Sequence, residues 1–460
     1  MKMKLKIIAL SMSIFAALSC AGCGNTSQSD ASQKEPPKAP QYAEKQFKIS
    51  GFWSPYEVTE EAFELYKNAG FNVFLMGNHS VKNWTTDTLT YLGSNRTEKS
   101  LELCKKVGLN ASLCYGEWYY ERCEGKNMPE TPFSSLDLYG DYADIIDSVH
   151  IADEPSKSQM KKYGDDNLTA DYKSVYGNKP YIVNLYPDYA PVSQIGATNY
   201  SDYLNAYGEE ILADFDGSAL VSVDYYPFRS EGFQTGWLGC YEKVAKTAKK
   251  YNAEKRFYIQ SAVKNEFADS LSEDDLRLQV YVALCFGASR LSYYCYAMPG
   301  YPDDCMYEKC MLGQDNNPTE IYDYVKNVNA EIQSFSSAFF AFEWIKTVGI
   351  TKDGTDGNPA ILKLKEEVDF SDRKYLTDVK SSVDAIIGCF ENGDGEAYMA
   401  VNYGQPSKTN DNVVEMNFKN VDYVAVYGGE SRSVDIVKLN GRKFSITLKS
   451  GEGKFIVPLK

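Results

Sequence analysis

Apolar, strand-like runs alternate with amphipathic, helix-like stretches from Phe47 onward, and this alternation occurs eight times in succession. Two of the helical stretches stop at Gly70 and Gly108, and glycine commonly ends a helix. Eight strand–helix units in a row predict an α/β fold, a (β/α)8 TIM barrel, over residues 47–349. The predicted strands are Phe47–Trp53, Phe71–Met76, Leu109–Tyr115, Ser148–Ala152, Pro180–Leu185, Ala219–Asp224, Arg256–Ser261 and Arg290–Tyr296. The predicted helices include Glu60–Ala69, Thr97–Val107, Trp237–Tyr251, Ser272–Phe286 and Pro318–Phe342.

The pattern changes near residue 350, where helix signals cease and short β-rich runs alternate with clusters of turn residues. Asn440-Gly441 lies between two such runs and is typical of a tight β-hairpin. We therefore expect a separate, C-terminal all-β sandwich domain over residues 350–460.

The N-terminus has the features of a secretion signal. Lysines precede an apolar stretch, Ile7–Leu18, that is too short to span a bilayer comfortably. Ala21-Gly22-Cys23 resembles the lipidation site of a bacterial lipoprotein, with Cys20 as a competing site and an ordinary secretory signal as the alternative. Residues 1–23 are expected to be the signal peptide, and the polar residues 24–46 a flexible tether. The protein is then expected to be extracytoplasmic and lipid-anchored to the bacterial cell membrane.

Charge and composition limit the possible chemistry. A formal net charge of −15 argues against nucleic acid as a partner, and against membrane contact beyond the lipid anchor. Only 2 histidines occur, which argues against a zinc site or a histidine-based triad. We expect no cofactor, no metal and a monomer. Cys305 and Cys310 share a predicted loop, and they could form a disulfide in an oxidising compartment.

Two carboxylates, Asp153 and Glu154, follow the fourth predicted strand and are stopped by Pro155. In a barrel of this kind the carboxyl ends of the strands assemble the active site, so Glu154 is the first candidate for acid–base chemistry. In a regular strand Asp153 would point the opposite way from Glu154. The structural alternative is a pair of acids that caps the next helix, with Pro155 at its first position.

Other polar and aromatic residues follow the remaining strands. Asp224, Glu117 and Glu266 are candidates for a second catalytic carboxylate. Aromatic rings pack on sugar C–H faces, and polar groups bind sugar hydroxyls, so residues near the strand ends are candidates for substrate binding. These are Trp53, Tyr56, Asn78, Tyr115, Trp118, Asp153, Asn184, Tyr186, Tyr226, Gln260, Tyr294 and Tyr296.

Residues 47–350 resemble the barrel of clan-A glycoside hydrolases, in which the fourth strand commonly ends in Asn-Glu-Pro. Here Glu154-Pro155 matches that motif, and Asp153 replaces the Asn. The Asp-Glu-Pro ending resembles glycosidase-like barrels of bacterial lipoproteins, whose trailing β domain the C-terminal segment also resembles. The resemblance implies that Glu154 is the acid/base. It also implies a nucleophilic Glu on the seventh strand, where this chain has Gln260.

An amide cannot attack as a carboxylate does, so the departure at Gln260 leaves three possibilities open. Glu266 could reach back to the site, Asp224 could be the second carboxylate, or the protein could bind sugar without cleaving it. We expect a glycoside hydrolase that acts on an extracellular oligo- or polysaccharide with Glu154 as general acid. The alternatives are a non-catalytic glycan-binding surface lipoprotein and a substrate-binding lipoprotein of a transporter.

Overall fold

The computed structural model describes residues 36–76, 94–114, 140–215, 217–352, 361, 364 and 368–460. The predicted signal peptide, the lipidation candidates Cys20 and Cys23, and most of the predicted tether lie outside these residues. The end of the predicted tether is described, and the ring of Tyr42 packs edge-on against Phe342 with centroids 6.0 Å apart. No helix in the described part of the chain is both long enough and apolar enough to span a bilayer.

Eight parallel strands form one sheet in the order β1-β10-β9-β6-β5-β4-β3-β2. The end strands β1 and β2 are linked through Asn72, whose backbone N–H donates to the Ile49 carbonyl at 3.1 Å. The Asn72 side chain accepts from the Ile49 N–H at 2.8 Å, so the sheet is a nearly closed barrel. Each predicted barrel strand is observed, with ends that differ by no more than two residues. The strands are β1 (Lys48–Gly51), β2 (Val73–Leu75), β3 (Asn110–Cys114), β4 (Ile146–Asp153), β5 (Tyr181–Leu185), β6 (Leu220–Val223), β9 (Glu254–Gln260) and β10 (Arg290–Tyr294).

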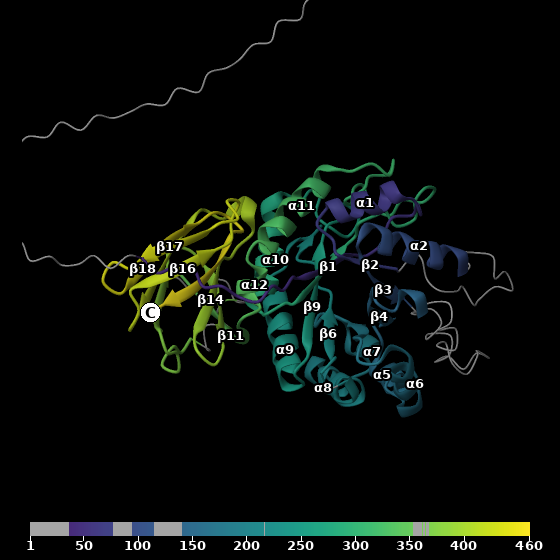
Figure 1. Cartoon of the computed structure of the whole chain (residues 1–460), viewed down its shortest axis with the longest axis horizontal. Helices are drawn as coiled ribbons and strands as arrows, with labels where there is room; N and C mark the ends of the chain where they lie inside the picture. The colour runs from purple at the N-terminus through teal and green to yellow at the C-terminus, as the bar shows by residue number, and fades with distance from the viewer. Residues whose placement is uncertain are drawn as a thin grey trace, which may run out of the picture. The chain divides into compact units, whose positions relative to one another are not determined.

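Helices surround the parallel strands (Figure 1). They include α1 (Glu60–Asn68), α2 (Ser94–Val107), α5 (Lys157–Tyr163), α6 (Asp166–Tyr176), α7 (Val192–Ile195), α8 (Tyr200–Glu210), α9 (Trp237–Lys250), α10 (Glu273–Cys285), α11 (Glu320–Gln333) and α12 (Ser336–Phe339). The predicted stop signals hold, because Gly70 and Gly108 take the left-handed backbone, with φ of 87° and 78°. A hairpin of β7 (Phe228–Arg229) and β8 (Gly232–Phe233) follows β6.

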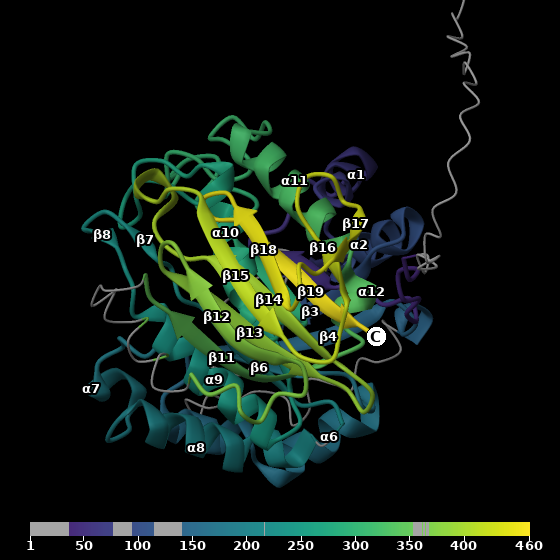
Figure 2. The same cartoon turned by 90° about the vertical axis from the view of Figure 1, so that its left-hand side faces the viewer.

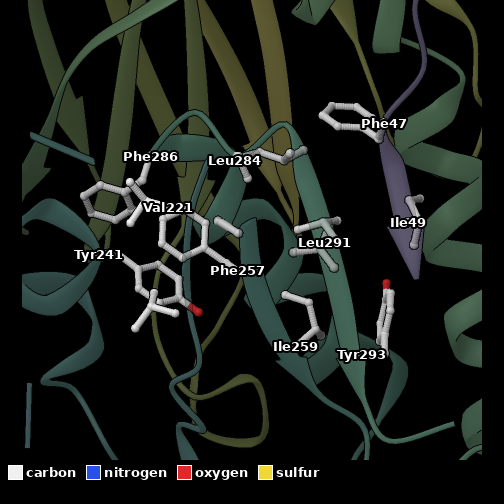
Figure 3. Packing of buried hydrophobic residues seen from close by; sticks show 14 of the residues in the cluster. Phe47, Ile49, Val221, Tyr241, Phe257, Ile259, Leu284, Phe286, Leu291 and Tyr293 are labelled. Carbon is white, nitrogen blue, oxygen red and sulfur yellow. The ribbon is translucent and has the colours of Figure 1, made fainter. Parts of the chain in front are cut away.

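The outward faces of the strands are apolar, and the inward faces are largely polar. Figure 3 shows the outward side chains of β1, β10, β9 and β6, with Tyr241 of α9 stacked on Phe257 at 4.0 Å between ring centroids. Inside the barrel, buried serines pair across strands, as Ser148 does with Ser112 at 3.0 Å. At the amino-terminal end of the strands, Arg290 is salt-bridged to Asp147 and Glu254. Small and polar inward residues leave room for the long polar side chains that reach the site.

The C-terminal part consists of antiparallel sheets, so the architecture agrees with a barrel followed by a β domain (Figure 2). One sheet has the order β11-β13-β14-β19-β16-β17 and the other β12-β15-β18, and side chains from both sheets form one core. The first strand, β11, begins at Glu343, before the predicted domain start at residue 350. The strands are β11 (Glu343–Ile350), β12 (Leu376–Ser381), β13 (Ala385–Glu391), β14 (Glu396–Asn402), β15 (Asn412–Phe418), β16 (Tyr423–Tyr427), β17 (Val434–Lys438), β18 (Lys443–Leu448) and β19 (Gly453–Leu459).

The six-stranded sheet contacts the barrel helices through specific hydrogen bonds. Trp237 of α9 donates to the Tyr403 hydroxyl at 2.9 Å, and Thr347 of β11 donates to the Cys285 carbonyl at 2.7 Å. Residues 37–460 thus form one compact unit.

Candidate active site

A cavity of about 280 Å³ lies at the carboxyl ends of the barrel strands. Several of its lining residues end or directly follow strands, which is where this architecture places active sites. It combines carboxylates, one amide, one guanidinium and several aromatic rings, a mixture suited to a polar ligand with apolar faces. The lining residues are Phe52, Asp153, Glu154, Asn184, Tyr189, Asp224, Tyr226, Arg229, Tyr258, Glu266, Phe267 and Tyr294.

A β-bulge on β4 brings Asp153 and Glu154 to the same cavity. The register against β5 shifts between His150 and Ala152, so one extra residue moves Asp153 onto the inward face that His150 occupies. Glu154 then adopts a left-handed backbone with φ of 47°, and its N–H donates to the Asn184 carbonyl at 2.8 Å. The expectation for a regular strand, with the two acids pointing apart, is therefore wrong, because β4 is not regular at this point.

Asn184 holds two of the carboxylates with one amide group. Its Nδ2 donates to Asp153 Oδ1 at 3.0 Å and to Asp224 Oδ1 at 2.9 Å. These two oxygens are therefore at most 3.0 plus 2.9, or 5.9 Å, apart. In contrast, no described residue donates a hydrogen bond to the Glu154 carboxylate. The three acids thus share one cavity but differ in how their charge is stabilised.

The pKa values of the three acids reflect burial, the neighbouring charges and the hydrogen bonds from Asn184. Burial, and then the negative charges of Asp224 and Asp153, raise the pKa of the Glu154 carboxyl. Burial and the charge of Asp153 also raise the pKa of Asp224, but the Asn184 hydrogen bond opposes that rise. Burial also raises the pKa of Asp153, and the Asn184 hydrogen bond and the positive charge of Arg256 oppose that rise. Glu154 is therefore the acid best suited to carry a proton at neutral pH.

Seven of the predicted site residues line the cavity: Asp153, Glu154, Asn184, Asp224, Tyr226, Glu266 and Tyr294. Glu266 comes from a loop after β9, and its carboxylate accepts a hydrogen bond from the Tyr307 hydroxyl at 2.9 Å. Asn78, Tyr115, Glu117 and Trp118 lie outside the described residues.

Gln260 has a different place from the predicted one. Its side chain is fully buried, with Oε1 accepting from the Phe228 N–H at 3.0 Å and Nε2 donating to the Phe228 carbonyl at 2.7 Å. The amide therefore holds the backbone of β7, the first strand of the hairpin. Gln260 is not among the cavity-lining residues.

Four predicted aromatic residues also lie away from the cavity lining. Tyr296 is fully buried because its ring packs against Tyr66 of α1, with ring centroids 4.9 Å apart. The Tyr56 hydroxyl donates to the Met298 carbonyl at 3.0 Å. Trp53 packs on Phe52 at 5.8 Å between centroids, and Tyr186 packs on Tyr203 at 6.4 Å.

Five lining residues were not predicted. Phe52 and Tyr258 lie on or beside predicted strands, so the alternation of strand faces could have indicated them. Tyr189, Arg229 and Phe267 come from loops or from the short β7 strand, where the sequence carries no comparable signal. Arg229 lies over the Phe267 ring, with its Cζ 5.4 Å from the centroid, and is the one cation among the lining residues.

Comparison with known proteins identifies the fold. No protein-family model matches the chain, and its sequence matches no curated protein. Among solved structures, a candidate alpha-galactosidase from Bacteroides fragilis NCTC 9343 matches with a TM-score of 0.50 at 8% identity, over 90% of this chain and 79% of that one. A glycoside hydrolase family 5 protein from Bacteroides vulgatus ATCC 8482 matches with a TM-score of 0.46 at 11% identity, over 90% and 89% of the two chains. At such identities the likeness concerns the fold alone.

Proposed function

We propose that this protein is a glycoside hydrolase that acts on an oligo- or polysaccharide, with Glu154 as general acid and Asp224 as the second carboxylate. One observation carries the proposal: Glu154 and Asp224 line one cavity, but Asn184 donates a hydrogen bond only to Asp224 of these two. Glycoside hydrolysis needs such a pair, one carboxyl protonated and the other ionised. The candidate alpha-galactosidase of the same fold supports this proposal.

The reaction would use the acids as follows. Glu154 transfers its proton to the glycosidic oxygen as the bond to the sugar carbon breaks, so the leaving group departs as an alcohol. Asp224 either bonds to the sugar carbon or removes a proton from the attacking water; in the first case water then breaks the bond to Asp224 while Glu154 takes the proton of that water. The carboxylate of Asp153 stabilises the positive charge that develops on the sugar ring. At the end of the cycle Glu154 regains a proton and Asp224 its charge.

The cavity walls suit a sugar. Rings of Phe52, Tyr226, Tyr258 and Tyr294 lie around the acids and offer apolar faces to sugar C–H groups. Tyr294 lies 5.4 Å from Tyr226 and 5.9 Å from Phe52 between ring centroids, so these rings form one aromatic wall.

The test compares Glu154→Gln with wild type on glycosides of one sugar that differ only in the leaving group. A panel of nitrophenyl glycosides first identifies the sugar. On an alkyl glycoside the variant is expected to lose roughly 10²- to 10⁴-fold in kcat/KM, the usual contribution of a general acid. On a dinitrophenyl glycoside the loss should be much smaller, because that leaving group needs no proton. Asp224→Asn should lose activity on both substrates.

The pH profile gives a second readout. Because the pKa of Glu154 is raised, wild-type kcat/KM should fall on the basic side at a pH well above the usual range of a glutamate. That basic limb should vanish in Glu154→Gln. Glu430→Gln, whose side chain is 71% exposed in the β domain, serves as the matched control and should behave as wild type.

A second function is favoured by one observation, the amide at Gln260. A glycan-binding protein on this fold would retain its glycan affinity in Glu154→Gln and hydrolyse no member of the panel. That result would overturn the hydrolase and support the binding protein.

A further inference from the structure

Four polar side chains form a continuous row across neighbouring strands and end at the cavity. Arg256 on β9, Ser222 on β6, Asn184 on β5 and Asp153 on β4 are register partners from one strand to the next. Arg256 Nε donates to Ser222 Oγ at 2.8 Å, and Ser222 Oγ donates to Asn184 Oδ1 at 2.7 Å. Asn184 Nδ2 then donates to Asp153 at 3.0 Å. We call these four residues the polar row.

The chemistry of the donors fixes the direction of every hydrogen bond in the polar row. A guanidinium can only donate, so Ser222 must accept from Arg256 and has a single hydrogen left to donate. That hydrogen goes to the Asn184 carbonyl oxygen. The Asn184 NH₂ group is consequently turned toward the acids, and its two hydrogens serve Asp153 and Asp224.

The contact between Arg256 and His150 agrees with these hydrogen-bond directions. Its Nη2 lies 3.4 Å from His150 Nδ1, which must accept and therefore belongs to a neutral imidazole. Burial, and then the charge of Arg256, lower the pKa of His150 to about 3, which agrees with the neutral form. Both side chains are almost fully buried.

Arg256 is also unusual as a buried charge. Its residue is 3% exposed, yet no described carboxylate lies within the 4.0 Å of an ion pair. Burying a cation without a paired anion costs free energy, so a residue with only a packing role would not be expected to be an arginine at this position. Its positive charge instead acts at longer range on Asp153, where it opposes the rise in pKa that burial causes.

We propose that Arg256 is a positioning residue: through Ser222 it orients the Asn184 amide, which in turn holds Asp153 and Asp224 at the cavity. This inference rests on the proposed function, in which Asp224 is the second carboxylate. Arg256 itself is not among the residues that line the cavity, so it would act only through its neighbours.

The test is Ser222→Ala, which interrupts the polar row with the loss of one oxygen atom. Without the serine hydroxyl the Asn184 amide is no longer oriented, and Asp224 loses a donor to its charged form. The pKa of Asp224 then rises, and the acidic limb of the kcat/KM profile should move to higher pH. Ser222→Thr keeps the hydroxyl and should leave the limb near its wild-type position.

Two further variants separate positioning from a loss of packing. Ser148→Ala removes another buried serine hydroxyl of the barrel interior, bonded to Ser112 at 3.0 Å, and should not move the acidic limb. Arg256→Lys keeps the charge without the Nε donor and should move the limb as Ser222→Ala does. The ionisable groups around Asp224 are the same in all these variants: Asp153, Glu154, Tyr186, Tyr189, Tyr226, Tyr241 and Tyr258.

Titration of the aspartates by ¹³C-carboxyl NMR tests the inference without turnover, with Asp224→Asn used to assign the signal. A higher pKa for Asp224 in Ser222→Ala supports the positioning role even if no glycoside is hydrolysed, which would refute only the proposed function. The positioning role is overturned if the Asp224 titration is the same in Ser222→Ala and wild type, or if Ser148→Ala shifts it equally.

Discussion

Substitution of Arg290 by methionine should destabilise the barrel strongly, because it leaves a buried carboxylate without its main partner. Arg290 and Asp147 form an ion pair with side chains 9% and 7% exposed. Glu254 binds Arg290 Nε at 2.5 Å but is 44% exposed, so water can solvate it after the change. Among the described residues, Lys48 at 3.3 Å is then the one cation paired with Asp147.

Breaking a buried ion pair from one side typically costs about 3–5 kcal/mol. The remaining contact with Lys48, whose side chain is 38% exposed, places Arg290→Met near the lower end, at about 3 kcal/mol. The double variant Arg290→Met, Asp147→Asn removes both charges and should recover much of that loss. Lys264→Met is the matched control, since Lys264 binds an 84% exposed Asp269 at 2.8 Å and should cost less than about 1 kcal/mol.

The assay is urea unfolding followed by circular dichroism, repeated between pH 3 and pH 7. Burial raises the pKa of Asp147, but the charges of Arg290 and Lys48 outweigh burial and hold that pKa below its usual range. A lowered carboxyl pKa stabilises the folded state above the unfolded-state value, near 4, and that stabilisation is lost as pH falls through the folded-state value. The gap between wild type and Arg290→Met should therefore narrow at acid pH. The reasoning fails if Arg290→Met costs no more than Lys264→Met, or if the double variant is as unstable as the sum of the two single ones.

Two further outcomes are expected. Glu331→Ala should cost about 3 kcal/mol or more in unfolding free energy, because this 2% exposed carboxylate accepts from Arg277 at 3.2 Å, from Tyr281 at 2.7 Å and from the Gly429 N–H of the β domain at 3.0 Å. Glu320→Ala, on the same helix with an exposed partner at 2.8 Å, is the control, and equal losses would contradict the account. Oxidation with a small disulfide should join Cys295 to Cys310, whose sulfurs are 3.0 Å apart, and not Cys305 to Cys310 as the sequence suggested. Peptide mapping shows the link, which Cys305→Ser should retain and Cys310→Ser should abolish.

The strands of the barrel could be predicted because each combines an apolar outward face with a clear end. Val221, Phe257 and Leu291 give that signal in consecutive strands of the sheet, and all three are fully buried. Asp153-Glu154-Pro155 was recognisable for a related reason, since two acids at the end of an apolar run are rarely a matter of packing alone. Residues whose position depends on one strand could thus be placed from the sequence.

Residues whose position depends on contacts between several strands could not be placed from the sequence. The bulge at β4 is invisible in the sequence, although it turns Asp153 into the cavity. The place of Gln260 depends on the hairpin after β6, which presents the Phe228 backbone to its amide. Arg256 and Ser222 become neighbours only through the register of β9 on β6. In each case the deciding contact lies between residues at least 30 positions apart or in a local irregularity.

Glu266 and Asp224 could each complement Glu154, and the hydrogen bonds around their carboxylates favour one of them. Glu266 follows Lys264 and Asn265, which both have a left-handed backbone, and the hydrogen bond that the structure gives its side chain comes from Tyr307 at 2.9 Å. Asp224 is 8% exposed and is held through Asn184 by a row of buried donors that crosses three strands. A catalytic group must keep its geometry through the reaction, and buried hydrogen bonds from rigid strands keep it better than a loop does. With the Gln260 amide bonded to the backbone of Phe228, the second carboxylate is then expected directly after the sixth strand, which only the fifth strand separates from the fourth, and not on the seventh.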